Sequence, residues 1–170
     1  MDRLILLLAR GGGLGLAPKA PGTVGTLGGL PLTALLLLPG NFWIYLVGCM
    51  LLVPLSAWIC GEAERILDCE DPGEVVFDEI IALPICYLGV FGLMTSQGDG
   101  MPDLSSVFAH KLWWAWALGG LLLFRLFDIW KPGPIYKAQS FRAGWGVTMD
   151  DVLASLLTCI ILAGVYFGLQ

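Results

Sequence analysis

Charged residues are scarce in this chain. Only 14% of its 170 residues are Asp, Glu, Lys or Arg, whereas 57% are hydrophobic and the mean hydropathy is +0.80. A typical soluble domain has about 25% charged residues. The composition therefore excludes an ordinary soluble fold and indicates a membrane protein. Because the length suits one domain, we expect residues 1–170 to form a single integral-membrane domain.

Basic residues are the scarcer of the two charged classes. Nine Lys and Arg stand against 14 Asp and Glu, which gives a formal net charge of −5 at pH 7. A nucleic-acid-binding surface needs clustered Lys and Arg to neutralise phosphates, and no such basic stripe is present. We therefore expect no nucleic-acid partner.

Histidine is scarce in the chain, and closely paired cysteines are lacking. His110 is the single histidine, which argues against a histidine nucleophile among several basic residues. The five cysteines include no C-x-x-C pair, and their odd number argues against a disulfide framework. Cys60 is followed by acidic residues, which would not stabilise a thiolate. We expect unreactive thiols, most of them buried.

Long charge-free runs predict an all-α, polytopic membrane bundle with four to five spans. The predicted spans are 23–38, 42–60, 80–98, 112–131 and 152–169. The first is short, and Pro39, Gly40 and Asn41 join it to the second as a hairpin, so it either crosses the bilayer or re-enters it. Residues 1–22 are expected to form an interfacial N-terminal segment.

Polar segments alternate with these spans and predict the orientation of the chain. In a five-segment arrangement the only cation on one side is Lys111, in the polar loop 99–111. The cations on the other side are Arg3, Arg10, Lys19, Arg65, Arg125, Lys131, Lys137 and Arg142. Since Lys and Arg are enriched in cytoplasmic loops, we expect 62–79 and 131–151 to be cytoplasmic active-site loops.

Two polar patches on this side carry candidate chemistry. Residues 18–26, PKAPGTVGT, form a Gly- and Thr-rich turn that is either a simple helix start or a cradle whose backbone N–H groups bind phosphate. Asp78 and Glu79 are adjacent acids at the start of a span. They either complement the helix dipole or bind a hard cation such as Mg²⁺ through their carboxylate oxygens.

A third patch combines acids with bases. Arg125, Asp128 and Lys131 recur every three residues and share one helical stripe. They form either an internal ion-pair ladder, or a site in which the aspartate binds metal and the two cations bind phosphate. Asp150 and Asp151 repeat the paired acids at the start of the last span. Together the patches favour metal-assisted phosphoryl transfer.

These motifs resemble the phosphatidylglycerophosphatase A family, small bacterial membrane enzymes that remove the terminal phosphate of phosphatidylglycerophosphate. The resemblance rests on residues 18–26, 71–79, 125–134 and 146–152. The chain departs from the family pattern at Ala82, Gly133 and Thr148. None of these departures removes a carboxylate, so they affect packing rather than chemistry.

The resemblance implies a Mg²⁺-dependent lipid phosphatase of the bacterial inner membrane, with a phospholipid substrate in the bilayer and its active site on the cytoplasmic face. The residues expected to be catalytic are Asp78, Glu79, Arg125, Asp128 and Lys131. The expected metal ligands are Asp78, Glu79, Asp128, Asp150 and Asp151. The residues expected to bind substrate are Lys19, Thr23, Gly25 and Thr26. Attack by water and attack by an Asp carboxylate both remain open.

Two other classes of function are alternatives. A small cation or proton transporter would also place carboxylates near the membrane, but usually in mid-span and within internal repeats. A membrane scaffold without activity would need neither paired acids nor Mg²⁺. Phosphate release with and without a chelator distinguishes the three.

Overall fold

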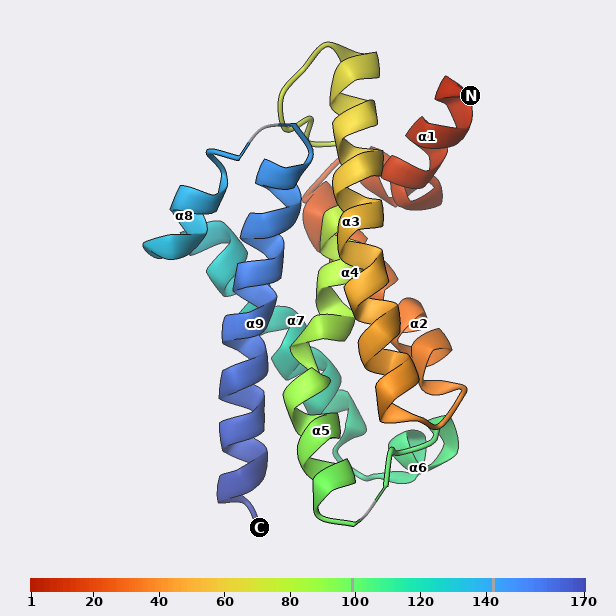
Figure 1. Ribbon diagram of the computed structural model, residues 1–170, viewed down its shortest axis with the longest axis vertical. Coiled ribbons are helices and arrows are strands. Elements are labelled where there is room, and N and C mark those ends of the chain that lie inside the picture. Colours follow the sequence, from red (N-terminus) through yellow and green to blue (C-terminus); the bar gives the residue numbers. More distant parts are fainter. Residues whose placement is uncertain (99, 142) are drawn as a thin grey trace.

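The computed structural model describes residues 1–98, 100–141 and 143–170, and every regular element of these residues is helical (Figure 1). In chain order they are α1 (Asp2–Ala9), the 3₁₀ helix η1 (Gly11–Leu16), α2 (Pro21–Leu37), α3 (Phe42–Leu67), α4 (Phe77–Cys86), α5 (Leu88–Ser96), α6 (Leu104–Ala109), α7 (Trp113–Trp130), α8 (Pro134–Ala138) and α9 (Trp145–Gly168). The predicted all-α class is confirmed. Asp99 and Arg142, which the sequence places in polar loops, lie outside the described residues.

The longest apolar helices support the predicted membrane bundle. Among the described residues, α3, α9 and the combined segment Phe77–Ser96 are long and apolar enough to cross a membrane, and α2 is a shorter apolar helix. Helix α7 carries Arg125 and Asp128 in its last two turns. The structure confirms an all-α membrane bundle, and whether α2 and α7 cross completely stays a prediction.

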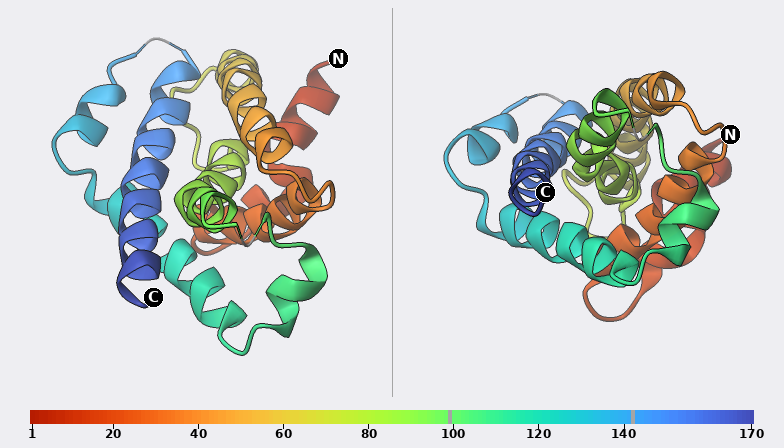
Figure 2. Two further views of the ribbon diagram at one scale, coloured as in Figure 1. Left: turned by 60° about the horizontal axis from the view of Figure 1, so that its bottom comes forward. Right: turned by 90° about the horizontal axis from the view of Figure 1, so that it is seen from below.

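Helix α4 lies at the centre of the bundle, in contact with α2, α3, α7 and α9 (Figure 2). It ends at Cys86, where the Tyr87 N–H donates to the Pro84 carbonyl at 3.2 Å. The Tyr45 hydroxyl donates to the Pro84 carbonyl at 2.8 Å, and Tyr87 donates to the Ala117 carbonyl of α7 at 3.2 Å. These bonds fix the break between α4 and α5, and hence the direction of α4 towards the site.

Small residues bring α3 and α9 close together. Gly61 and Gly144 meet where the helices cross, and a side chain on Gly144 would collide with the α3 backbone. Next to this crossing, the buried hydroxyls of Ser56 and Thr148 lie 3.1 Å apart in a hydrogen bond. Thr148, a departure from the family pattern, therefore has a polar partner inside the bundle.

The helices run further than the charge pattern predicted. Helix α3 continues to Leu67, because Glu62 and Arg65 pair at 2.8 Å along its surface instead of ending it, and the left-handed Asp68 ends it. Helix α4 begins at Phe77, so the predicted loop 62–79 shortens to 68–76. In the predicted loop 131–151, α8 intervenes and α9 begins at Trp145.

The polar connections gather at one end of the bundle. Helix α1 and the segments 68–76 and 131–141 lie at this end, whereas the 38–41 turn, α6 and the C-terminus lie at the other (Figure 1). Helix α1 packs its buried Ile5 and Ala9 inward and exposes Leu4, Leu7 and Leu8. Two opposed apolar faces suit a helix between protein and lipid, and the interfacial position of residues 1–22 stays a prediction.

Candidate active site

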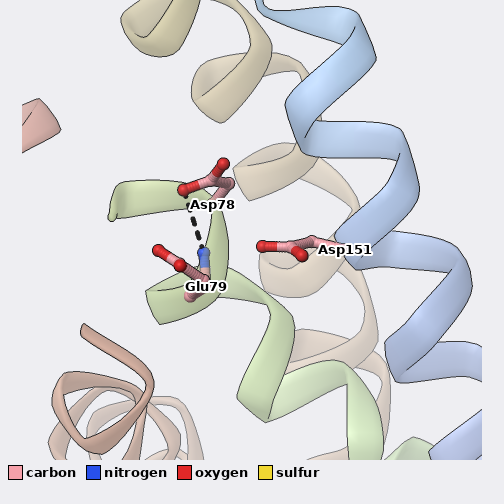
Figure 3. Close-up of side chains that lie close together, drawn as sticks. All are labelled: Asp78, Glu79 and Asp151. Atoms are coloured by element: carbon pink, nitrogen blue, oxygen red, sulfur yellow. Dashed lines mark hydrogen bonds between the residues drawn. The ribbon is translucent and has the colours of Figure 1, made fainter. Parts of the chain in front are cut away.

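Three carboxylates from two helices lie close together, and that of Asp151 points from α9 towards α4 (Figure 3). Asp78 and Glu79 lie in the first turn of α4, and Asp151 lies in the second turn of α9. Each offers an oxygen within 4.8 Å of those of the other two. The packing of α4 against α9 therefore brings together three of the five expected metal ligands.

The other two expected ligands, Asp128 and Asp150, are engaged with cations. Asp128 Oδ2 lies 2.6 Å from Arg125 Nη1, and Asp150 Oδ2 accepts a hydrogen bond from Lys131 Nζ at 2.6 Å. The same Arg125 Nη1 lies 3.4 Å from Glu79 Oε1. The expected ladder along α7 therefore forms only in part, because Lys131 reaches across to α9.

The position of Lys131 follows from the end of α7. It adopts the left-handed conformation that ends the helix, with φ of 46°, and Pro132 follows. From there Lys131 Nζ donates to Asp150 Oδ2 of α9.

These groups surround a small acidic cavity of about 120 Å³. Its lining residues are Asp71, Gly73, Val75, Asp78, Glu79, Asp128, Lys131, Val147, Asp150 and Asp151. Six of these ten residues are acidic and one is basic, and a liquid water takes about 30 Å³. The cavity has the size for a small ion and a few waters, and its excess of carboxylates favours a cation.

Two oxygens of the cluster lack protein partners. Glu79 Oε2 and Asp151 Oδ2 are buried and accept no hydrogen bond from any residue that the structure describes. Leaving a buried polar atom unpaired costs about 1–3 kcal/mol, and more if it is charged. Asp78 Oδ1, in contrast, accepts a hydrogen bond from the Glu79 N–H at 3.2 Å. The cluster therefore presents unused, buried carboxylate oxygens, the donor set that Mg²⁺ prefers.

The expected phosphate cradle lies beside this cavity rather than in its wall. None of its four residues lines the cavity: Lys19, Thr23, Gly25 and Thr26. Lys19 is exposed, and the hydroxyl of the fully buried Thr26 donates to the Gly22 carbonyl at 2.8 Å within α2. Gly25 lets α2 approach the side chain of Val76. Thr23 lies half-buried in the first turn of α2.

Sequence reasoning missed Gly22, which brings α2 to the site. Its Cα adjoins Glu79 Oε1 and Arg125 Nη1 so closely that a Cβ would collide with both. Asp71 and Gly73, for which the 71–79 motif predicts no role of their own, also line the cavity. Their position before the paired acids was the one available signal.

His110, for which the sequence predicts no catalytic role, lies far from the acidic cluster. His110 is an exposed residue that ends α6, at the opposite end of the bundle. All five cysteines are free, and Cys69 is the exposed one. The absence of a histidine or cysteine nucleophile stays a prediction.

Comparisons with known proteins identify the family. The model of the phosphatidylglycerophosphatase A family matches residues 7–166. A Haemophilus influenzae protein named phosphatidylglycerophosphatase A is 34% identical over 164 residues, which cover 96% of this chain and 89% of that protein. An Escherichia coli protein of the same name is 30% identical over 158 residues, covering 92% and 80%.

A third relative bears a different name. A Bacteroides thetaiotaomicron protein, provisionally named a phosphatidylinositol-3-phosphatase, is 33% identical over 170 residues, covering 94% of this chain and 92% of its own. No solved structure matches the chain. The family match over residues 7–166 and the two relatives that share its name confirm the resemblance drawn from the motifs, so the chain belongs to the phosphatidylglycerophosphatase A family.

Proposed function

We propose that this protein is a Mg²⁺-dependent phosphatase that hydrolyses phosphatidylglycerophosphate to phosphatidylglycerol and inorganic phosphate, in the bacterial inner membrane. The observation that carries the proposal is the cluster of Asp78, Glu79 and Asp151, with two buried oxygens that no described residue satisfies. The family and the names of its relatives supply the substrate.

The residues present fit a divalent cation. Asp78, Glu79 and Asp151 would hold Mg²⁺, and Asp128 and Asp150 face the same cavity. When bound, Mg²⁺ neutralises negative charge on the phosphate and its leaving oxygen. Three mutually close carboxylates repel one another, so the cluster also has an electrostatic reason to take up a cation.

Two cations adjoin the cluster and are suited to bind the phosphate. Arg125 reaches the site from the last turns of α7, and Lys131 follows at the end of that helix. Asp128 and Asp150, which line the cavity, pair with Arg125 and Lys131 respectively. Strong charge-assisted hydrogen bonds from both cations to phosphate oxygens would stabilise the charge that develops during transfer.

The first turn of α2 supplies further donors. Its first N–H groups have no acceptor within the helix, and Gly22 lies against the Arg125–Glu79 pair. We assign Thr23 and this turn to phosphate binding, with the exposed Lys19 attracting the lipid headgroup. Gly25 and Thr26 support the turn by packing and by a helical hydrogen bond.

Two routes for the attack fit this arrangement. In one, a carboxylate accepts a proton while water attacks phosphorus. In the other, an Asp carboxylate attacks phosphorus, and water then hydrolyses the phospho-enzyme. In both routes the bond between phosphorus and the glycerol oxygen breaks, and the glycerol oxygen receives a proton.

Phosphate release by purified protein in detergent tests the proposal. Phosphatidylglycerophosphate should be hydrolysed with Mg²⁺, hydrolysis should stop when a chelator is added, and it should return with fresh Mg²⁺. Phosphatidylinositol 3-phosphate, suggested by the third relative's name, serves as the competing substrate. Activity that survives the chelator would contradict the metal assignment, and absence of phosphate release with both lipids would contradict the function.

The location of the site on the cytoplasmic face needs a separate test. Single cysteines are introduced at Gly73, Gly100 and Gln139 in a variant without native cysteines, and a membrane-impermeant thiol reagent is applied to intact cells. We expect only the cysteine at position 100 to react. If the cysteine at position 73 or 139 reacts while that at position 100 is protected, the predicted orientation is wrong.

A further inference from the structure

The N-terminal segment holds the connection between α3 and α4 from outside the bundle. The Val76 N–H donates to the Ala9 carbonyl at 2.9 Å, and Ala9 is fully buried. This bond joins the last residue of α1 to the residue immediately before α4. Helix α1 and this connection share the same end of the molecule (Figure 1).

A side-chain contact reinforces this attachment. Arg10 Nη2 donates to Glu74 Oε1, and both side chains are half-buried, 26% and 32% exposed. Partial burial weakens the competition from water, so such a pair is stronger than one on an open surface. The backbone is held as well, because Gly15 lies so close to the Glu74 carbonyl that a side chain there would collide with it.

The attached stretch is also part of the cavity wall. Gly73 and Val75 line the cavity on either side of Glu74, and Asp78 follows two residues after Val76. Within the connection, the Val75 N–H donates to the Pro72 carbonyl at 2.8 Å, and the Asp71 N–H donates to Glu64 Oε1 at 3.2 Å. Contacts from the N-terminal segment therefore complete the support of residues 73–76.

We propose that Arg10 and Glu74 are positioning residues that, with the Ala9 carbonyl, hold residues 73–76 in place beside the acidic cluster. Neither side chain lines the cavity, so both act through the segment between Gly73 and Asp78. The inference rests on the proposed function for its consequence on turnover, but the attachment itself is a property of the fold. Misplacement of reacting groups by about 1 Å can cost as much as 100-fold in rate.

Turnover of phosphatidylglycerophosphate with Mg²⁺ gives the first test. Arg10→Gln and Glu74→Gln should each lower kcat by about tenfold with KM changed by less than about twofold, because the binding groups remain. The double variant should be no worse than either single one, since both remove the same contact. Arg10→Lys should recover most of the loss. Arg65→Gln, which breaks the Glu62 pair within α3, is the matched control and should leave kcat unchanged.

A measurement without substrate separates the inference from the proposed function. A spin label is attached at Gly73→Cys, where a side chain meets no atom within 4 Å, in a chain that also carries Cys69→Ser. Arg10→Gln should increase the mobility of the label, and Arg65→Gln should not. If the wild-type protein releases no phosphate but the label responds, the proposed function fails and the attachment stands. Unchanged mobility of the label would overturn the inference. A fall in kcat accompanied by an equal rise in KM would also overturn it.

Discussion

The helix caps at one end of the bundle and the buried acids at the other differ in how their oxygens are satisfied. At the end that holds the C-terminus, two exposed caps bind neighbours in sequence: Asn41 accepts from the N–H groups of Trp43 and Ile44, and Asp103 accepts from that of Ser106. At the other end, Asp78 and Asp151 are buried and meet across two helices.

This difference distinguishes structural from functional polar groups. A cap such as Asn41 satisfies N–H groups that its helix would otherwise leave free, and so stabilises that helix. Glu79 Oε2 and Asp151 Oδ2 have no hydrogen-bond partner among the described residues, and their burial opposes folding. Such groups fit a site that a ligand completes.

The largest difference in kcat is expected when one carboxylate at each end of the bundle is replaced by an amide. Asp78→Asn removes a charged oxygen from the proposed metal site and should lower kcat by about 100-fold or more. Asp103→Asn should leave kcat unchanged, since Asn also caps helices well. The measurement is phosphate release with excess Mg²⁺, with helix content checked by circular dichroism. A kcat of Asp78→Asn within a few-fold of wild type would remove Asp78 from the site.

The native Asp103 cap at the far end should also be insensitive to acid. The hydroxyls of Ser105 and Ser106 hydrogen-bond to Asp103 and lower its pKa to about 2. A carboxylate whose pKa is lowered stabilises the fold above its unfolded pKa, and that stabilisation is lost only as the pH falls through the folded pKa. The Asp103 cap should therefore persist down to about pH 2, well below any pH used in the assay.

The fold was largely predictable because apolar runs and their interruptions are local features of the sequence. Helix ends were predicted less well. The acids and Arg65 at the end of α3 are good helix formers, so charge marked the end of the apolar run but not the end of the helix. The break at Tyr87 depends on Tyr45, a residue from another helix, and no local pattern reveals it.

The types of residue in the site were predictable from the sequence, but the ion pairs that these residues form were not. Adjacent acids at helix starts identified Asp78 and Asp151 because buried charges are rare without a function. That Lys131 would pair with Asp150, rather than with Asp128 on its own stripe, depends on the crossing of α7 and α9. Gly22 carries no functional group, so only the packed structure shows its role.

Two lysines near the same end should differ in their effects. Lys131→Gln removes the ammonium group paired with Asp150 and should lower kcat/KM by about 10- to 100-fold, because a phosphate-binding cation is lost. Lys137→Gln alters an exposed lysine of α8 and should have no effect beyond about twofold. The ratio of kcat/KM in the two variants is the measurement. Equal effects would mean that net charge, rather than the Lys131 site, attracts the substrate.

A smaller difference in kcat is expected between two glycine substitutions on different helices. Gly22→Ala places a methyl group against Glu79 Oε1 and Arg125 Nη1. Both atoms end flexible side chains, so the fold should tolerate the change, while their displacement should lower kcat by about tenfold. Gly164→Ala on α9 meets no atom within 4 Å and should leave kcat unchanged. If Gly22→Ala retained full activity, the first turn of α2 would have no role in placing this pair.

The smallest effect is expected where a buried polar contact is structural. Ser56→Ala leaves the Thr148 hydroxyl without its partner across α3 and α9, and should lower the free energy of unfolding by about 1 kcal/mol with little change in kcat. Ser56→Ala combined with Thr148→Val should cost less than the two single changes added, because both partners are then apolar.

Thr95→Val is the control, since its hydroxyl bonds to the Phe91 carbonyl of its own helix at 2.8 Å. Unfolding in detergent measures all four variants. A large loss of kcat in Ser56→Ala, with stability unchanged, would contradict a structural role and would mean that the Ser56–Thr148 bond sets the position of Asp151 in the site.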